Sequence, residues 1–328
     1  MKIQRRGLLK AGTLAALGGP LLAPAWAQGG PFPSKPVTIV VPFPAGGNTD
    51  IVARTVAVAL GKVLGQPVVV DNRGGGGGSI GANVVARAQP DGYTLLLCGA
   101  GVVVTVPEMV KTAYSRKDFA PIGLVNKSSM VLLARKNDPR FKTFQEFVAY
   151  ARSGEGKVNA AHSGPGTPNH LAQLQLEALL KAKFTPVSYK GSGPALVDLI
   201  GGQVDVHFDQ VTSSLQHIRA GTLEPLAVLG PTEDPALPGV KTVAELGFGQ
   251  IDGTTYVGVL GPSGMPPALQ EQLAKALAQA VQDPQTVRSA RELGSVAISS
   301  TPQEFGRILD AEYTLASAAA KDGRLKVD

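Results

Sequence analysis

A glycine-containing turn between residues 42 and 50 carries the residue types best suited to binding an anion. Its sequence, Pro-Phe-Pro-Ala-Gly-Gly-Asn-Thr-Asp, follows the apolar run 37–41 and precedes apolar residues at the spacing of one helical face. The two glycines allow close approach of the backbone to a ligand, and Asn48 or Thr49 is suited to cap the helix. Free N–H groups at a helix N-terminus form an anion site. The turn has no nucleophile, histidine or metal-ligand pair, so it is suited to holding an anion and not to transforming one.

Two more glycine-containing turns follow predicted strands in the first part of the chain. Residues 68–70 are predicted to form a buried strand, which is followed by the glycine run 74–78 and by Ser79 at the start of a helix. Residues 93–97 are predicted to form a third strand, followed by Gly99-Ala100-Gly101. Alternating strands and helices indicate a parallel sheet covered by helices, in which ligands bind beyond the carboxyl ends of the strands. All three turns are expected on that edge.

A second unit with the same organisation is predicted to begin near residue 131. Polar and glycine residues again follow its predicted strands, at Ser163-Gly164-Pro165-Gly166-Thr167-Pro168, at Lys190-Gly191-Ser192-Gly193-Pro194 and at Asp209. The last strand and helices are predicted to return to the first unit, so the chain crosses between the units twice. Two crossings make a hinge between two lobes that enclose a cleft. The predicted organisation is an export signal at 1–27, a first lobe of 28–127 with 254–328, and a second lobe of 128–253.

The N-terminal residues are predicted to be an export signal. Four basic residues precede the modest apolar segment 14–22, which is too short to anchor the chain in a membrane. Ala25-Trp26-Ala27 has the form of a cleavage site, and Arg5-Arg6 fits a twin-arginine (Tat) signal about as well as a Sec signal. The mature protein is therefore expected in the periplasm. Removal of the four basic residues lowers the net charge from +6 to about +2, and no basic patch suggests nucleic-acid binding.

The residues that could support other chemistry have simpler explanations. Cys98 ends an apolar run and is expected to be a buried small hydrophobe. The segment 76–81 fits a dinucleotide-binding pattern only as any glycine run would. His162 and Ser163 are adjacent, so on a strand they point to opposite faces and do not form a hydrolase pair. No cofactor or metal ion is expected.

Seven ordered motifs resemble those of the Bug-type substrate-binding proteins of tripartite tricarboxylate transporters, and together they cover nearly the whole mature chain. They are residues 42–50, Val70-Asp71-Asn72-Arg73 with its glycine tail, Pro90-Asp91-Gly92-Tyr93-Thr94-Leu95, Gly166-Thr167-Pro168-Asn169-His170-Leu171, Tyr189-Lys190-Gly191-Ser192-Gly193-Pro194-Ala195, Gly201-Gly202-Gln203-Val204-Asp205 and Phe208-Asp209. The chain departs from the family pattern at 74–78, where proline and alanine are usual, and at Gln210-Val211-Thr212, where Asn-x-Pro is usual.

The resemblance implies an α/β fold of the two-lobed, type II periplasmic-binding-protein kind, each lobe a mainly parallel sheet with helices on both faces. It implies a protein that closes on a small carboxylate and delivers it to the membrane subunits of a transporter. By analogy, backbone amides of the opening turn hold one carboxylate, while Gly164, Thr167 and Asp209 face the ligand from the second lobe. The protein is expected to be a monomer and not an enzyme.

The candidate ligand-binding residues come from the glycine-containing turns and the strand ends. They are Phe43, Pro44, Ala45, Gly46, Gly47, Asn48, Asp50, Gly78, Ser79, Gly101, Ser163, Gly164, Thr167, His170, Tyr189 and Asp209. Several of these residues could instead have structural roles. Asp209 could instead cap the following helix, and His170 could be a packing residue. Arg73, outside the set, could pair with the ligand or with Asp71 or Asp91.

Three functions follow from these features. The leading hypothesis is a solute receptor, because an exported chain with anion-binding turns lacks a catalytic constellation. The alternatives are a periplasmic enzyme that uses Asp209 or His170 as acid or base, and a sensor subunit that presents the ligand to a kinase. For the receptor, we expect the carboxylate to be held by neutral backbone N–H groups of residues 44–48, since that turn has no lysine or arginine.

Overall fold

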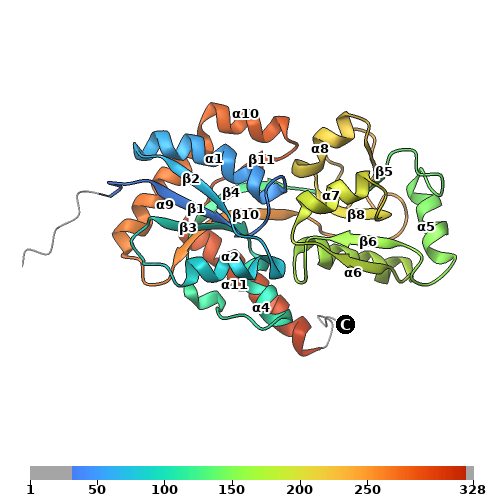
Figure 1. Ribbon diagram of the computed structural model, residues 1–328, viewed down its shortest axis with the longest axis horizontal. Coiled ribbons are helices and arrows are strands. Elements are labelled where there is room, and N and C mark those ends of the chain that lie inside the picture. The colour runs from blue at the N-terminus through green and yellow to red at the C-terminus, as the bar shows by residue number, and fades with distance from the viewer. Residues whose placement is uncertain (1–31, 323–328) are drawn as a thin grey trace, which may run out of the picture.

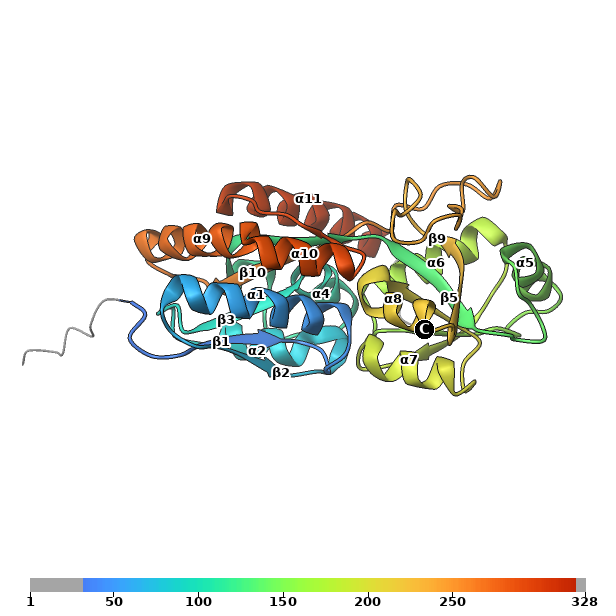
Figure 2. The same cartoon turned by 90° about the horizontal axis from the view of Figure 1, so that it is seen from above.

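The computed structural model describes residues 32–322 and arranges them as two α/β lobes that lie side by side (Figures 1 and 2). The first lobe is built on a six-stranded sheet of order β11-β4-β10-β3-β1-β2, and the second on a five-stranded sheet of order β7-β6-β8-β5-β9. The predicted export signal lies outside the described residues.

The sheet of the first lobe is mixed. Strand β1 pairs in parallel with β2 and β3, whereas β10 pairs antiparallel with β3 and β4, and β11 antiparallel with β4. Its elements are β1 (Val37–Val41), α1 (Asn48–Leu64), β2 (Val68–Asn72), a 3-10 turn (Gly76–Gly78), α2 (Ser79–Ala86), β3 (Thr94–Gly99), α3 (Gly101–Val104), α4 (Val106–Met109), a 3-10 turn (Arg116–Asp118), β4 (Phe119–Ser128), β10 (Thr255–Pro262), α9 (Pro267–Gln282), α10 (Pro284–Glu292), β11 (Val296–Ala297) and α11 (Pro302–Lys321).

The second lobe repeats this design with a parallel centre and antiparallel strands beside it. Strand β6 pairs in parallel with β7 and β8, and β5 pairs antiparallel with β8 and β9. Its elements are β5 (Met130–Arg135), α5 (Phe144–Arg152), β6 (Asn159–His162), α6 (Pro168–Leu180), β7 (Thr185–Ser188), α7 (Ser192–Ile200), β8 (Val206–Gln210), α8 (Val211–Arg219) and β9 (Leu223–Val228).

Alternating side chains of the central strands build a core on each face of the first sheet. Ile39 and Leu95 pack with α1 and α9, whereas Val40 and Leu96 pack with α2, α3 and α11 on the other face. The C-terminal helices therefore return to cover the first lobe, as the sequence predicts. Cys98 lies buried in the second of these cores, as expected, and burial raises the pKa of its thiol.

The helix boundaries follow the expected signals, with one exception. Capping boxes formed by Thr143 with Glu146 and by Thr301 with Glu304 open α5 and α11. The predicted cap of α1 by Asn48 or Thr49 is wrong. Gly47 occupies the N-cap position without a side-chain hydrogen bond, and Asn48 is already the first helical residue. The side chains of Asn48 and Thr49 therefore do not cap the helix.

Strand β2 corrects another expectation from the sequence. The apolar run at its start was expected to be buried on both faces, but β2 lies at the edge of the sheet. Val69 is half exposed there. A run of β-branched residues is compatible with an edge strand as well as with a central strand. The two differ in whether another strand pairs along the second edge, which the local sequence does not show.

The chain passes between the two sheets at Ser128–Met130 and again at Gly253–Thr255. The two crossings lie beside each other, since Thr255 pairs with Ser128 in the sheet and donates its hydroxyl to the Ser128 carbonyl over 3.0 Å. From the second lobe, the Thr212 hydroxyl donates to Ser128 Oγ over 3.0 Å. A Cβ atom added at Gly253 would overlap the carbonyl oxygen of Leu229. The second crossing therefore requires a glycine.

Two glycine substitutions should have opposite effects on stability. We expect Gly253→Ala to lower the free energy of unfolding by about 2 kcal/mol or more, because the added methyl group overlaps backbone that cannot move freely. Gly306→Ala, within α11, should raise it by about 0.5–1 kcal/mol, because its Cβ meets only Pro121 at 3.6 Å. Urea denaturation of both variants measures this. An unchanged midpoint for Gly253→Ala would show that the crossing does not need a glycine.

Candidate ligand-binding cleft

A cavity of about 980 Å³ lies between the two lobes. Its walls come from strand ends and helix starts of both lobes, and from α11. The first lobe contributes Phe43, Gly47, Asn48, Thr49, Gly99, Ala100, Gly101, Val102, Thr105, Thr255, Tyr256 and Val257. The second lobe contributes Met130, Ser163, Gly166, Thr167, Pro168, Asn169, Ser192 and Gln210. No lysine, arginine or histidine is among the described residues that line it.

Four of the longer helices, each of nine or more residues, begin at the cavity wall. Asn48 is the first residue of α1 and Pro168 the first of α6, while Ser192 opens α7 and Gln210 caps α8. Each helix N-terminus carries roughly half a positive charge on its unpaired N–H groups. The end of the cavity where these helices begin is therefore suited to an anion, although no lysine, arginine or histidine of residues 32–322 lines it.

Asn48 supplies an additional polar group to this wall. Its side chain is 6% exposed, and its Oδ1 atom has no hydrogen-bond partner among the described residues. A buried polar atom without a partner costs about 1–3 kcal/mol. Because Oδ1 can only accept, a hydrogen-bond donor on the ligand, such as a hydroxyl group, removes that cost, whereas the carboxamide nitrogen is the atom that can donate to a carboxylate.

Asp50, a predicted ligand residue, does not line the cavity but holds the opening turn in place. Its carboxylate accepts hydrogen bonds from Gly46 N at 3.0 Å, Arg54 Nε at 3.0 Å and Asn72 Nδ2 at 3.0 Å. Asn72 also donates to the Phe43 carbonyl over 3.0 Å. Burial by itself would raise the pKa of Asp50, but these hydrogen bonds more than offset it and the pKa lies below its usual value. Asp50 is thus an ionised support behind the turn.

Residues 44–46 of the opening turn face the second lobe rather than the cavity. Pro44 has no N–H group to offer, and the Gly46 N–H is already donated to Asp50. A Cβ atom at Gly191 would lie 2.9 Å from Pro44 Cδ, and one at Gly193 would overlap the Ala45 carbonyl oxygen. The expectation that residues 44–46 provide the N–H groups is therefore corrected. Only Gly47 and Asn48 of the expected segment line the cavity.

Asp209, at the end of β8, is fully buried behind the cavity wall. Its carboxylate accepts hydrogen bonds from Ser192 Oγ at 2.5 Å and Ser213 Oγ at 2.8 Å. Burial raises the pKa of this carboxyl, and the nearby His207 and the two hydroxyls offset that only in part. His207 Nδ1 lies 2.9 Å from the Ala161 carbonyl, which can only accept, so Nδ1 carries a proton. Asp209 therefore acts on the cavity through Ser192 and not by touching it.

His170, another candidate, is also buried outside the cavity lining. Its ring stacks on that of His162 with centroids 4.5 Å apart. The Nδ1 atom of His162 accepts a hydrogen bond from Gly164 N at 3.2 Å, and that of His170 accepts one from Gly166 N at 3.4 Å. Burial, with a smaller contribution from His170, lowers the pKa of His162 to about 4. The pair is neutral and supports the turn 163–167.

The other candidates divide between the wall and its surroundings. Phe43, Gly101, Ser163 and Thr167 line the cavity, whereas Gly78, Ser79, Gly164 and Tyr189 do not. The Tyr189 hydroxyl donates to Asp198 over 2.7 Å. A Cβ atom at Gly164 would lie 3.0 Å from Gly77 Cα, so a glycine at this position allows the two lobes to approach each other closely. Arg73 pairs with Asp71 over 2.9 Å, as one alternative anticipated.

Sequence reasoning missed the contribution of α11 to the cavity. Glu312, Leu315, Ala316, Ala318 and Ala319 line it from the C-terminal half of that helix. The missed residues at the strand ends include Thr49, Thr105, Asn169, Ser192, Gln210 and Thr255. Thr49 and Ser192 lie in glycine-containing turns that the sequence did identify, and this was the signal available for them.

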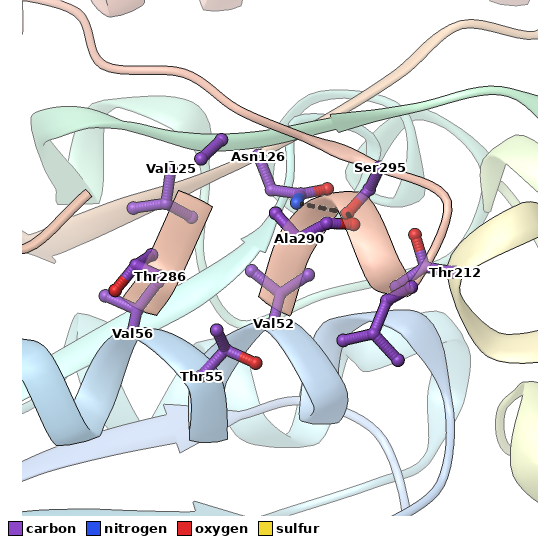
Figure 3. Close-up of a pocket in the computed structure, with 11 residues that line it drawn as sticks. Val52, Thr55, Val56, Val125, Asn126, Thr212, Thr286, Ala290 and Ser295 are labelled. Atoms are coloured by element: carbon purple, nitrogen blue, oxygen red, sulfur yellow. Dashed lines mark hydrogen bonds between the residues drawn. The ribbon is translucent and has the colours of Figure 1, made fainter. Parts of the chain in front are cut away.

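A second, much smaller cavity lies beside the first crossing (Figure 3). Val52 and Val56 of α1, Ala290 of α10 and Asn126 of β4 surround it, and Thr212 approaches from the second lobe (Figure 3). Its volume is about 10 Å³, which is room for one water molecule at most. This cavity is therefore too small for an organic ligand.

No helix within residues 32–322 has the length and apolarity needed to cross a membrane. The same residues contain no group of three or more histidine, cysteine or acidic side chains placed to hold a metal ion.

Comparison with known proteins identifies a single family. The family model described as "Tripartite tricarboxylate transporter family receptor" matches residues 52–320. The structure of the periplasmic binding protein BugD is similar to this one, with a TM-score of 0.85, 34% sequence identity, and coverage of 90% of this chain and 100% of BugD.

Two similar structures contain ligands. MatC (Rpa3494) from Rhodopseudomonas palustris with bound malate has a TM-score of 0.83 and 33% identity, covering 88% of this chain and 100% of MatC. Rpa4515 from R. palustris with adipate has a TM-score of 0.85 and 30% identity, covering 90% of this chain and 100% of Rpa4515.

The buried histidine pair should make the protein sensitive to acid. The pKa of His162 is about 4 in the folded protein and about 6.5 when unfolded. As the pH falls below 6.5, the unfolded state binds a proton that the folded state does not. Stability present above about pH 6.5 is therefore lost as the pH approaches 4, by up to about 3 kcal/mol.

Urea denaturation at intervals across this pH range measures the loss. His162→Asn keeps a hydrogen-bond acceptor for Gly164 but cannot titrate, so its stability should vary less with pH. His217→Asn, a partly exposed histidine of α8, should behave like the unmodified protein. Equal pH dependence in the His162 variant and the unmodified protein would contradict the assignment.

Proposed function

The chain belongs to the tripartite tricarboxylate transporter receptor family, and from this premise we propose that it captures a small carboxylate in the interlobe cleft and delivers it to the membrane subunits of such a transporter. It is a solute-binding protein, so the enzyme alternative is wrong. The relatives that bind malate and adipate support a small carboxylate as the ligand.

The observation that carries this proposal is the convergence of four helix N-termini on a cavity that no lysine or arginine of residues 32–322 lines. Hydrogen bonds to a charged group contribute about 1.5–3 kcal/mol each. Two or three of them, less the costs of desolvation and ordering, suffice for micromolar affinity. A carboxylate is small enough to accept bonds from the N–H groups of residues 47–49 and from the Asn48 carboxamide together.

Ser192 has a different task in this proposal. Its hydroxyl proton is directed to Asp209 over 2.5 Å, so its lone pairs face the cavity and Ser163, whose Oγ lies 3.0 Å away. This arrangement offers acceptors and not donors. It suits a hydroxyl group or another donor on the ligand, while Asp209 acts as a positioning residue that fixes the direction of the Ser192 hydroxyl.

The lobes are the proposed moving parts. Residues 28–127 with 254–328 would move against residues 128–253 about the paired crossings at Ser128 and Thr255. Contact of the opening turn with Gly191 and Gly193 is possible only when the lobes are together. The site is complete only in that state, so ligand binding favours closure. The export signal and the periplasmic relative BugD support a periplasmic location.

Isothermal titration with malate and adipate tests this function. We expect binding of at least one of them, with a dissociation constant that changes less than about threefold between 50 and 300 mM NaCl, because no pair of full charges is formed. Asn48→Ala should weaken binding about tenfold by removing one charge-assisted hydrogen bond. Asn83→Ala, a partly exposed asparagine of α2, is the matched control and should bind normally.

Failure of the whole series of small carboxylates to bind would contradict the proposal. A steep loss of affinity with salt would indicate instead that a lysine or arginine holds the ligand.

A further inference from the structure

The cavity is longer than a carboxylate group requires. Helix α6 begins at its wall with Pro168 and still lines it at Ala178, ten residues later. At 1.5 Å per residue this is about 15 Å along the helix axis. The far part, which we call the outer compartment, is lined by Leu171, Leu174, Gln175 and Ala178 of α6, by Ile251–Thr254, and by Glu312, Leu315, Ala316 and Ala319 of α11.

Helix α11 reaches the outer compartment from the first lobe. It packs against β4 and α3 through buried residues such as Phe305 and Leu309, and its C-terminal half extends beyond them toward the second lobe (Figure 1). The cavity wall joins this half of α11 to α6, so the compartment belongs to both lobes. Most of the side chains that face it are aliphatic. Leu315 lines the compartment and is otherwise largely exposed to solvent.

Glu312 is the exception to the aliphatic lining. Its carboxylate is partly buried at the cavity wall and forms no hydrogen bond or ion pair with another described residue. Burial raises the pKa of this carboxyl to about 7, as expected for a carboxylate taken from water without a partner. Such a group is costly unless something in the cavity pairs with it.

The distribution of charge along the cavity is uneven. Among the described residues that line it, the only formally charged ones are Asp252 and Glu312, both acidic and both in the outer compartment. Asp252 is exposed, and it accepts a hydrogen bond from Thr254 N at 3.2 Å. The inner end carries the positive ends of the four helices. A ligand that spans the cavity therefore meets a site for an anion at one end and a negative charge at the other.

We propose that the outer compartment is a second ligand subsite, which takes the far end of an unbranched carboxylate and pairs Glu312 with a primary ammonium group there. This inference rests on the proposed function of the inner end. Leu171, Leu174 and Leu315 contact the methylene chain between the two charged groups. The protein then selects ω-amino carboxylates and disfavours dicarboxylates of the same length, because a second carboxylate would face Glu312.

Paired ligands of equal length test this selectivity. Isothermal titration at about pH 8.5, where Glu312 is ionised, compares unbranched ω-amino acids from butanoate to octanoate with the dicarboxylates of equal carbon number and with the simple fatty acids. For the best-fitting length we expect the ω-amino acid to bind at least tenfold more tightly than its dicarboxylate. The fatty acid should lie between them.

Two variants assign the effect to Glu312. Glu312→Gln keeps the shape of the side chain and removes its charge, so the preference should fall to within about threefold, with a gain for the dicarboxylate. Asp310→Asn removes a charge from the same helix outside the cavity lining, where Asp310 pairs with Arg116, and should keep the preference. Thermal unfolding establishes that both variants are folded.

The outcomes separate this inference from the function on which it rests. Absence of binding by every carboxylate would overturn the proposed function itself. Dicarboxylates that bind as tightly as the matched ω-amino acids would overturn the second subsite alone. A preference that survives in Glu312→Gln would also overturn it, because the selectivity would then arise elsewhere.

Discussion

The structure depends on the meeting of helix N-termini from two lobes around a space that no lysine or arginine of the described residues lines. The field of a helix end falls off within its first turn, so it acts only on a group that touches the turn. One lobe supplies α1, and the other supplies α6, α7 and α8. Neither lobe alone surrounds a ligand. We therefore propose that binding and closure are the same event, and the glycines at the contact between the lobes allow the backbones to meet.

Two buried carboxylates support this arrangement from behind. Asp50 ties the opening turn to Arg54 and Asn72, and Asp209 fixes Ser192 in the facing turn. Both are almost completely buried and neither lines the cavity. They fix hydrogen-bonding groups of the two turns that meet at the proposed ligand site. Without such supports, each N–H or hydroxyl would have to be ordered at the moment of binding, at a cost in affinity.

Much of the fold could be predicted from the sequence, because its signals are local. Alternating strands and helices, capping boxes such as Thr143 with Glu146, and glycine-containing turns all follow from short segments. Phe43, Ser163 and Thr167, which line the cavity, were predicted in this way. The roles of Asp209 and His170 were not, because the face a side chain occupies at a strand end depends on its neighbours in space. The contribution of α11 carries no local signal, since alanine and leucine there also fit an ordinary packed helix.

The crystal structure of a carboxylate complex tests the central claim most directly. The account predicts that the carboxylate oxygens lie about 2.7–3.0 Å from N–H groups of the first turn of α1 and from the Asn48 carboxamide. It also predicts that no lysine or arginine nitrogen lies within about 4 Å of them. A ligand carboxylate paired with a lysine or arginine, and out of reach of the α1 N-terminus, would contradict it.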